Sequence, residues 1–366
     1  MDDVTDTVFR QIIAGCAKPD LFYTEFVNVD GLQSRGRKKL IHKLQFAGSE
    51  QPIFAQIWGK NPDNYYKIAR QIVDGTIQRE IENLTKQSGL SKMQGDKEKR
   101  ASRIINTASE HRTQSTQQFA KTAGGVASLA GEQASAARMF GGFSGIDINM
   151  GCPDKSVVKN GNCSALINNR SLAAEIIAAT KKGAAGKIPV SVKIRTGFNE
   201  VDFSWPRFIL EQEIDLLTVH GRTTKEMSKV PNRWADIAKV REIRDEIAPE
   251  TQIIGNGDVL SRKQGEDLAK KYKLDGIMIG RGALANPFVF APGNSWADLA
   301  PKQKAQLYKK HIELFIATWQ NNERNFQGLK KFAKMYLNGF ASAGKIRTEL
   351  VRKQTLPEML KVLEKI

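Results

Sequence analysis

The chain has 366 residues, 40% of them hydrophobic, which is enough for one barrel-sized domain and a smaller second one. Lysine and arginine total 56 against 39 acidic residues, and the formal net charge of +17 favours polyanionic partners such as nucleic acid, although a generally basic proteome would give the same balance. No apolar run approaches the roughly 18 residues of a membrane span, and the acidic first residues are unlike a signal or transit peptide.

Three cysteines, Cys16, Cys152 and Cys163, are scattered along the chain. They cannot all pair, and their spacing matches neither a disulfide framework nor a zinc site. We therefore expect a reducing, cytoplasmic location and no metal site.

Short apolar runs rich in β-branched residues alternate with longer helical patterns, which is typical of a parallel α/β fold. The predicted strands are residues 21–26, 52–57, 145–148, 189–194, 215–220, 252–256 and 275–279. Nearly every one ends in a polar residue or is flanked by glycine, whereas a doubly wound sheet would concentrate such residues near one switch point. The pattern therefore predicts a TIM (β/α)8-type barrel.

Such a barrel needs eight strands, and only seven are predicted. The first helical pattern begins around residues 5–10 with Thr5 or Asp6 as its N-cap, so Met1 lies where strand one should end. We expect the chain as given to lack strand one, so that translation starts upstream or a nonlocal segment fills the gap.

The barrel domain is predicted to span residues 1–292, with an interruption at about 76–140. This stretch is rich in Lys, Arg, Glu, Gln, Ser and Thr, which indicates an inserted, solvated helical excursion. A dedicated RNA-binding element is the alternative.

Only helical periodicity follows, over residues 297–366. This region holds 14 Lys or Arg against 6 Asp or Glu, an excess of 8 positive charges. Its apolar positions recur at helical spacing and should be buried, namely Leu307, Ile312, Phe315, Ile316, Trp319, Leu329, Phe332, Met335, Tyr336 and Phe340. The basic positions expected outside, where they can neutralise phosphates, are Lys330, Lys331, Lys334, Lys345, Arg347, Arg352 and Lys353.

Residues 149–153, Asn-Met-Gly-Cys-Pro, directly follow a predicted buried strand. Gly151 permits a tight turn and Pro153 fixes its own φ, so Cys152 is held at a strand end, where barrels keep their active sites. Cys152 is therefore the candidate for the chemistry. A small buried hydrophobe is the alternative for a lone cysteine.

Seven short motifs together resemble the dihydrouridine synthases, and the bacterial branch acting mostly on transfer RNA is the most similar. The motifs occur in the family's order and cover the chain to about residue 290. They are MDDVTD at 1–6, YTE at 23–25, DINMGCP at 147–153, VKIRTG at 192–197, VHGRT at 219–223, GNGD at 255–258 and IGRGA at 279–283.

The resemblance implies a barrel that binds flavin mononucleotide (FMN), followed by a helical RNA-binding domain. It also implies that NADPH reduces the flavin, that hydride passes to C6 of a uracil ring and that an acid protonates C5. Cys152 matches the family's acid, and a thiol with an ordinary pKa of about 8.5 is protonated yet able to donate near neutral pH. Cys163 matches a small-residue position and is interpreted as a packing residue.

The resemblance also assigns cofactor residues. Lys193 offers a positive charge to the N1/O2 edge of reduced flavin, Gln56 an amide to the ring, and His220 a hydrogen bond to the flavin or its ribityl chain. Rim ion pairing for Lys193 and a structural role for His220 are the alternatives. Met1 is all that remains here of the family's proline–methionine turn that seats the flavin. The predicted phosphate site follows strands seven and eight of the barrel, at Asn256, Gly257, Asp258, Gly280 and Arg281.

For the substrate, the resemblance places Asn149 beside the uracil edge. Arg195 and Arg222 lie one step beyond and suit RNA phosphate or base contacts, with rim ion pairs as the alternative. The uridine must be flipped out of its stack to reach the barrel. Two other hypotheses stay open: a flavin barrel that reduces a free small molecule, and a catalytically silent RNA-binding protein.

Overall fold

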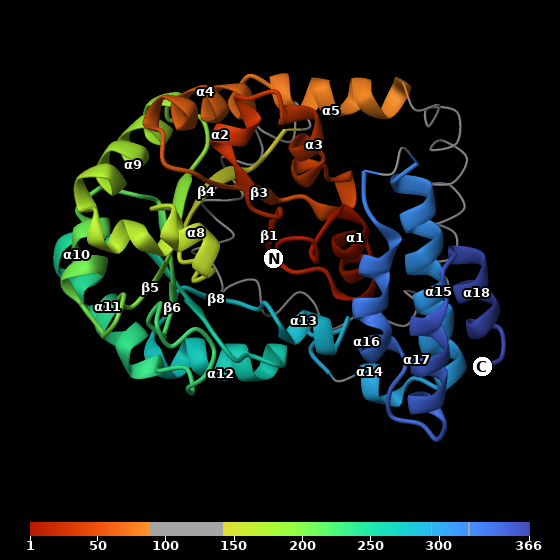
Figure 1. Ribbon diagram of the computed structural model, residues 1–366. Coiled ribbons are helices and arrows are strands. Elements are labelled where there is room, and N and C mark those ends of the chain that lie inside the picture. Colours follow the sequence, from red (N-terminus) through yellow and green to blue (C-terminus); the bar gives the residue numbers. More distant parts are fainter. Residues whose placement is uncertain (88–141, 294, 321–322) are drawn as a thin grey trace, which may run out of the picture.

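The computed structural model describes residues 1–87, 142–293, 295–320 and 323–366. Figure 1 shows a sheet wrapped by helices, beside a group of helices from the C-terminal part of the chain. The strands are β1 (Phe22–Tyr23), β2 (Val27–Asn28), β3 (Ile53–Trp58), β4 (Gly145–Met150), β5 (Val190–Arg195), β6 (Leu216–His220), β7 (Gln252–Asn256) and β8 (Gly276–Met278).

All strand pairs are parallel, in the order β1-β3-β4-β5-β6-β7-β8, and β2 also pairs with β3. The predicted α/β barrel-type fold is confirmed. Within the described ranges no strand precedes β1, and β1 and β8, the two ends of the path, are not paired with each other.

The prediction of one continuous strand at residues 21–26 is wrong. The chain leaves the ladder after β1, where the Thr24 hydroxyl accepts from the Gln56 backbone N–H at 2.9 Å and donates to the Glu25 carbonyl at 2.8 Å. Because a side chain replaces a backbone partner there, the strand bends and resumes as β2. The bend places Glu25 beside the C-terminal helices.

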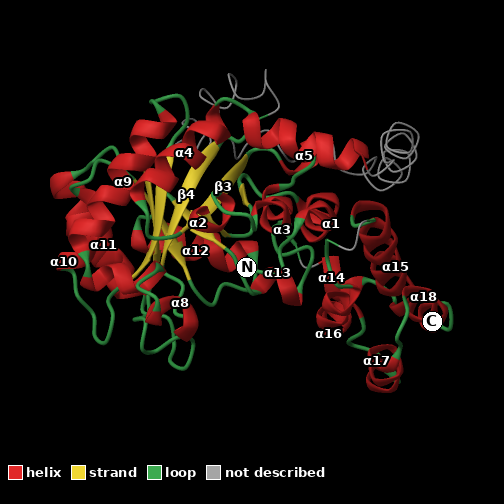
Figure 2. Cartoon of the chain, turned by 45° about the horizontal axis from the view of Figure 1, so that its top comes forward, coloured by secondary structure: helices red, strands yellow, loops and turns green. Residues whose placement is uncertain are grey.

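Long helices such as α4 (Pro62–Val73), α9 (Arg170–Ala184) and α11 (Trp234–Ile247) cover the outside of the sheet, as Figure 2 shows in a turned view.

The other described helices before residue 294 are α1 (Thr7–Ala17), α2 (Val29–Leu32), α3 (Arg37–Leu40), α5 (Thr76–Gln87), α8 (Lys155–Lys159), α10 (Ser204–Leu210), α12 (Arg262–Tyr272) and α13 (Gly282–Ala285), with 3-10 turns η1 (Ile41–Leu44), η2 (Gly48–Glu50) and η3 (Cys163–Asn168). Of the two predicted caps of α1, Asp6 is the N-cap, and its carboxylate accepts from Phe9 N at 2.9 Å. Gly183 of α9 lets that helix approach α4, since a Cβ there would lie 2.5 Å from the Tyr66 carbonyl oxygen.

The first part of the predicted insertion is a helix that packs against the barrel core. Residues 76–87 form α5, and Ile77 and Ile81 are buried in the core because they lie on one face of that helix. Residues 88–140 of the predicted insertion lie outside the described residues.

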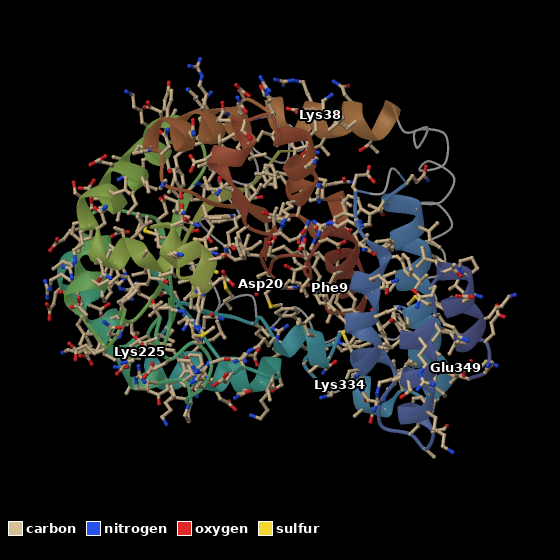
Figure 3. All side chains as sticks on the ribbon, viewed as in Figure 1. Phe9, Asp20, Lys38, Lys225, Lys334 and Glu349 are labelled. Carbon is tan, nitrogen blue, oxygen red and sulfur yellow. The ribbon has the colours of Figure 1, made fainter. Side chains whose placement is uncertain are left out.

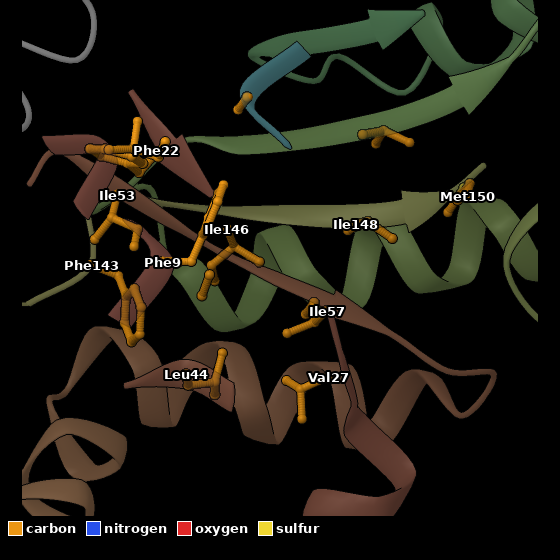
Figure 4. Close-up of a cluster of buried hydrophobic side chains, with 14 of the residues drawn as sticks. Phe9, Phe22, Val27, Leu44, Ile53, Ile57, Phe143, Ile146, Ile148 and Met150 are labelled. Atoms are coloured by element: carbon orange, nitrogen blue, oxygen red, sulfur yellow. The ribbon is translucent and has the colours of Figure 1, made fainter. Parts of the chain in front are cut away.

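The core is continuous from the barrel interior to the helices. Figure 4 shows Ile53 and Ile57 of β3 gathered with Ile146 of β4, Val27 of β2 and Leu44 of η1. Every residue of β4 is buried, which is expected for a strand with both faces covered in a parallel sheet. This rigid sheet determines where the residues at its carboxyl ends lie.

The C-terminal region is all helical, as predicted. Its elements are α14 (Ser295–Asp298), α15 (Pro301–Thr318), η4 (Phe326–Phe332), α16 (Ala333–Tyr336), α17 (Ala343–Arg352) and α18 (Leu356–Leu363). The predicted apolar positions are buried or partly buried, except Ile316, which is exposed. Phe9 of α1 stacks on Phe332 with ring centroids 5.2 Å apart, so the region packs directly on the barrel. None of the described helices is both long and apolar enough to cross a membrane.

Candidate active site

The strand register brings the predicted site residues to one edge of the sheet. Asn149 is the direct neighbour of Lys193 across β4 and β5. Arg195 neighbours His220, which in turn neighbours Asn256. Because all these strands are parallel, their carboxyl ends open on the same side of the barrel.

The turn that carries Cys152 is held by all four of its backbone polar groups. The N–H groups of Gly151 and Cys152 both donate to Asn149 Oδ1, at 3.1 and 3.0 Å. Arg195 Nε donates to the Gly151 carbonyl at 2.8 Å, and Ser164 Oγ donates to the Cys152 carbonyl at 2.8 Å. A Cβ on Gly151 would lie 3.2 Å from the Ile194 carbonyl carbon, so glycine lets the turn lie against β5. The thiol is therefore carried on a preorganised support.

The Cys152 thiol is half-buried and has an altered acidity. A hydrogen bond with the Cys163 thiol, opposed by burial, lowers the pKa of Cys152 to about 7. Cys163 is fully buried, and burial together with the same hydrogen bond raises the pKa of Cys163 well above its ordinary range. Cys163 thus packs in the core and also contacts the candidate acid, a contact that sequence reasoning missed.

Lys193 is a half-buried cation in β5. Burial, and then the charge of Arg195, lower the pKa of Lys193 to about 8. Within the described ranges its amine has no hydrogen-bond or ion-pair partner, so it is available to an anionic group of a ligand. The predicted alternative of a rim ion pair does not occur among these residues.

His220 is neutral. Burial, reinforced by the charges of Lys193, Arg195 and Arg222, lowers the pKa of His220 to about 2. Arg222 Nη1 lies 3.1 Å from His220 Nε2, and because a guanidinium only donates, Nε2 accepts and the ring proton is on Nδ1. His220 can therefore offer a ligand one N–H donor.

The two arginines predicted to contact RNA are largely engaged with the protein. Arg195 also donates from Nη1 to the Thr223 and Met227 carbonyls, each at 2.9 Å. Arg222 is 2% exposed and donates from Nε to the Val230 carbonyl at 2.6 Å. Their surroundings make both arginines supports of the rim loops, and the RNA contacts stay a prediction.

Ion pairs connect residues of the predicted phosphate site to each other and to Arg222. Asp258 lies between Arg222 and Arg281, with Arg281 Nη2 donating to Oδ1 at 2.8 Å. Burial raises the pKa of Asp258, but the hydrogen bond and charge of Arg222, the Asn232 backbone N–H and the charge of Arg281 together lower it overall. Asn256 Nδ2 donates to the Met278 carbonyl at 2.8 Å, while a Cβ on Gly280 would meet nothing within 4 Å. The site thus has open space at Gly280 and a largely exposed cation, Arg281.

Sequence reasoning also missed a buried carboxylate below the turn. Asp147 is fully buried in β4 and accepts hydrogen bonds from Gln56 Nε2 at 2.6 Å and Ser191 Oγ at 2.5 Å. The available signal was an acidic residue inside an otherwise apolar strand, because such a residue is rarely buried without partners.

Comparison with known proteins shows which family this chain belongs to. The family model described as "Dihydrouridine synthase (Dus)" matches residues 1–83 and 90–366. The chain belongs to the dihydrouridine synthase family. It is 35% identical over 367 residues to a "Probable tRNA-dihydrouridine synthase" of Staphylococcus aureus (strain COL), covering 100% of this chain and 90% of that protein. It is 34% identical, over 100% of this chain and 91% of the relative, to "Probable tRNA-dihydrouridine synthase 2" of Bacillus subtilis (strain 168).

Membership of the family makes this protein an oxidoreductase. Its C-terminal region carries a basic surface. The seven basic side chains predicted to lie outside are all exposed or partly exposed. Figure 3 labels one of them, Lys334 on α16. Among the described residues, Lys331, Lys334, Lys345 and Arg352 form no ion pair.

Proposed function

We propose that this protein reduces a uridine in tRNA to 5,6-dihydrouridine, with FMN as its bound cofactor and NADPH as the electron donor. The observation that carries the proposal is the fixed Cys152 turn beside the unpaired Lys193 cation. The relatives named above, whose names specify tRNA, support the choice of substrate.

The residues at the barrel mouth fit a flavin. Lys193 would face the anionic edge of the ring, Gln56 its polar atoms, and the His220 Nδ1–H an acceptor of the ring or ribityl chain. Gly280 leaves space for a phosphate, next to the exposed Arg281. Bound flavin would supply hydride to C6 of uracil after reduction by NADPH.

Cys152 would supply the proton. With its pKa lowered to about 7, a substantial fraction of the thiol is protonated near neutral pH and able to donate to C5. The thiolate left behind would be stabilised by the hydrogen bond from Cys163 and the charge of Arg195. Asn149 is held beside this thiol by the two backbone bonds that its Oδ1 accepts, and its amino group faces Gln56.

The C-terminal region would hold the RNA backbone. Replacing Lys331, Lys334, Lys345 and Arg352 by alanine should weaken tRNA binding and flatten its dependence on salt, because fewer counterions are released. Oxidation of NADPH in the absence of tRNA should not change. Equal loss of both would contradict this assignment.

The deciding experiment expresses the chain in a host stripped of its own dihydrouridine synthases. Dihydrouridine in purified tRNA is then measured and mapped by mass spectrometry, with Cys152→Ala as the matched control. Restoration by the natural chain alone supports the proposal and identifies the uridine. A protein that binds FMN and oxidises NADPH but leaves tRNA unmodified would point to a small-molecule reductase. One that binds tRNA without flavin would be a silent homologue.

A further inference from the structure

A chain of hydrogen bonds runs from the buried Asp147 carboxylate to the Cys152 turn. Asp147 Oδ2 accepts from Gln56 Nε2 at 2.6 Å, and Gln56 Oε1 accepts from Asn149 Nδ2 at 3.3 Å. Asn149 Oδ1 then accepts from the N–H groups of Gly151 and Cys152. All three side chains of the chain are at least nine-tenths buried, so water does not compete with these bonds.

The direction of this chain is set at both of its ends, by the Asp147 carboxylate at one end and by the backbone N–H groups of the Cys152 turn at the other. An amide side chain has two orientations of nearly equal shape, which differ only in where its donor and acceptor lie. The Asp147 carboxylate accepts on both oxygens, from Gln56 Nε2 and from Ser191 Oγ, so Gln56 turns its amino group toward Asp147 and its oxygen toward Asn149. Asn149 must then turn its amino group toward Gln56, and its oxygen toward the Cys152 turn.

At the other end of the chain, the backbone disfavours the reversed arrangement. If both amides turned over, the Asn149 amino group would face the N–H groups of Gly151 and Cys152, none of which can accept. Both backbone donors would lose their partner. The turn cannot move to recover one, because Arg195 and Ser164 hold its carbonyls.

We propose that Asp147 is a positioning residue that, together with the backbone N–H groups of the turn, sets the direction of the Gln56 and Asn149 amides and, through them, holds the Cys152 thiol against Cys163. This inference rests on the proposed function, and deepens it by assigning a role below the site. Ser191 donates to the other carboxylate oxygen at 2.5 Å and keeps the carboxylate in place. Burial raises the pKa of Asp147, and the bonds from Ser191 and Gln56, with the charge of Lys193, oppose that rise.

The test is the pH dependence of Cys152 alkylation by iodoacetamide, located by mass spectrometry in the purified full-length protein. Asp147→Asn has the same shape but can also donate, so the direction is no longer fixed at this end of the chain of hydrogen bonds. We expect the midpoint to move upward from about 7 and the alkylation rate at pH 7 to fall about threefold to tenfold, as the thiol returns toward its ordinary pKa of about 8.5.

Two further variants separate direction from packing. The first is the double variant Asp147→Asn with Gln56→Glu. Its carboxylate now stands at position 56, where it accepts from the amide at position 147 and from Asn149. The direction of the Asn149 amide is thereby restored. We expect at least half of the shift in midpoint to be recovered. Ser191→Ala removes a bond from the same carboxylate without changing the direction, and its midpoint should stay at the natural value.

An unshifted midpoint in folded Asp147→Asn would overturn the proposal. An equal shift in Ser191→Ala, or no recovery in the double variant, would reduce Asp147 to a packing role and also overturn it. If Asp147→Asn does not fold, recovery of a folded protein in the double variant supports the proposal, and a double variant that is equally unfolded refutes it. Because no flavin, NADPH or tRNA takes part, this result is independent of whether the protein makes dihydrouridine.

Discussion

Replacing Arg324 by methionine should destabilise the protein strongly, because it breaks a buried ion pair between the barrel and the C-terminal region. Arg324 Nη1 donates to Glu25 Oε1 at 3.1 Å, and Nη2 contacts Oε2. The Glu25 side chain is 0% exposed and that of Arg324 is 8% exposed. Methionine keeps much of the apolar stem that packs there and removes only the charge and its donors.

The magnitude follows from leaving Glu25 buried without its partner. Removing one member of a buried pair costs about 3–5 kcal/mol of unfolding free energy. The guanidinium also lies 5.4 Å from the centroid of the Trp319 ring, a contact worth about 0.5–1 kcal/mol more. We therefore expect a loss of about 3.5–6 kcal/mol at pH 7.

The loss should depend on pH through Glu25. Burial raises the pKa of Glu25 above its ordinary 4.5, and Arg324 opposes that rise, so the substitution should raise this pKa further. A carboxyl group whose folded pKa is raised contributes its stability below the unfolded pKa and loses it as pH rises through the folded pKa. The deficit of Arg324→Met should therefore be small near pH 4.5 and grow toward pH 7.

Urea unfolding followed by tryptophan fluorescence at pH 5 and pH 7 measures this, and Trp319 lies beside the pair as a reporter. Glu25→Gln and the double variant complete the cycle, and the double variant should be more stable at pH 7 than Arg324→Met alone. Exposed ion pairs contribute at most about 1 kcal/mol. A loss of unfolding free energy below that value would therefore refute the reasoning. So would an equal deficit at both pH values.

Three further predictions concern the site. Cys163→Ala removes the bond that lowers the pKa of Cys152, so the midpoint of Cys152 alkylation should rise from about 7 toward about 8.5, and protonated Cys152 should persist to higher pH; an unchanged midpoint would contradict the thiol contact. Lys193→Met should weaken FMN binding about 10- to 100-fold in an absorbance titration, as expected for a lost charge-assisted bond, and an unchanged affinity would place the flavin elsewhere. Arg195→Lys cannot replace all the donors to three carbonyls, so unfolding free energy should fall by about 1–3 kcal/mol in urea; wild-type stability would show that those bonds are dispensable.

Much of the barrel and several of its site positions could be predicted from local sequence. Buried strands of a parallel sheet are short apolar runs, and the polar residue that follows each run must lie at the same edge, as Asn149, Lys193 and His220 do. The break between β1 and β2 could not be predicted, because it depends on the Thr24 hydroxyl meeting β3 from 32 residues away.

The sequence by itself determined the fold class, the family motifs in their order, the candidate acid Cys152 and the basic helical tail, because each is encoded in local periodicity or in side-chain type. Only the tertiary structure decided which polar groups pair with one another. It pairs Glu25 with Arg324 across 299 residues, turns Arg195 inward to hold the Cys152 turn, and places Cys163 against Cys152. The physical reason is that a buried polar group must find its partner in space rather than along the chain, so close packing settles which donors stay free for a ligand.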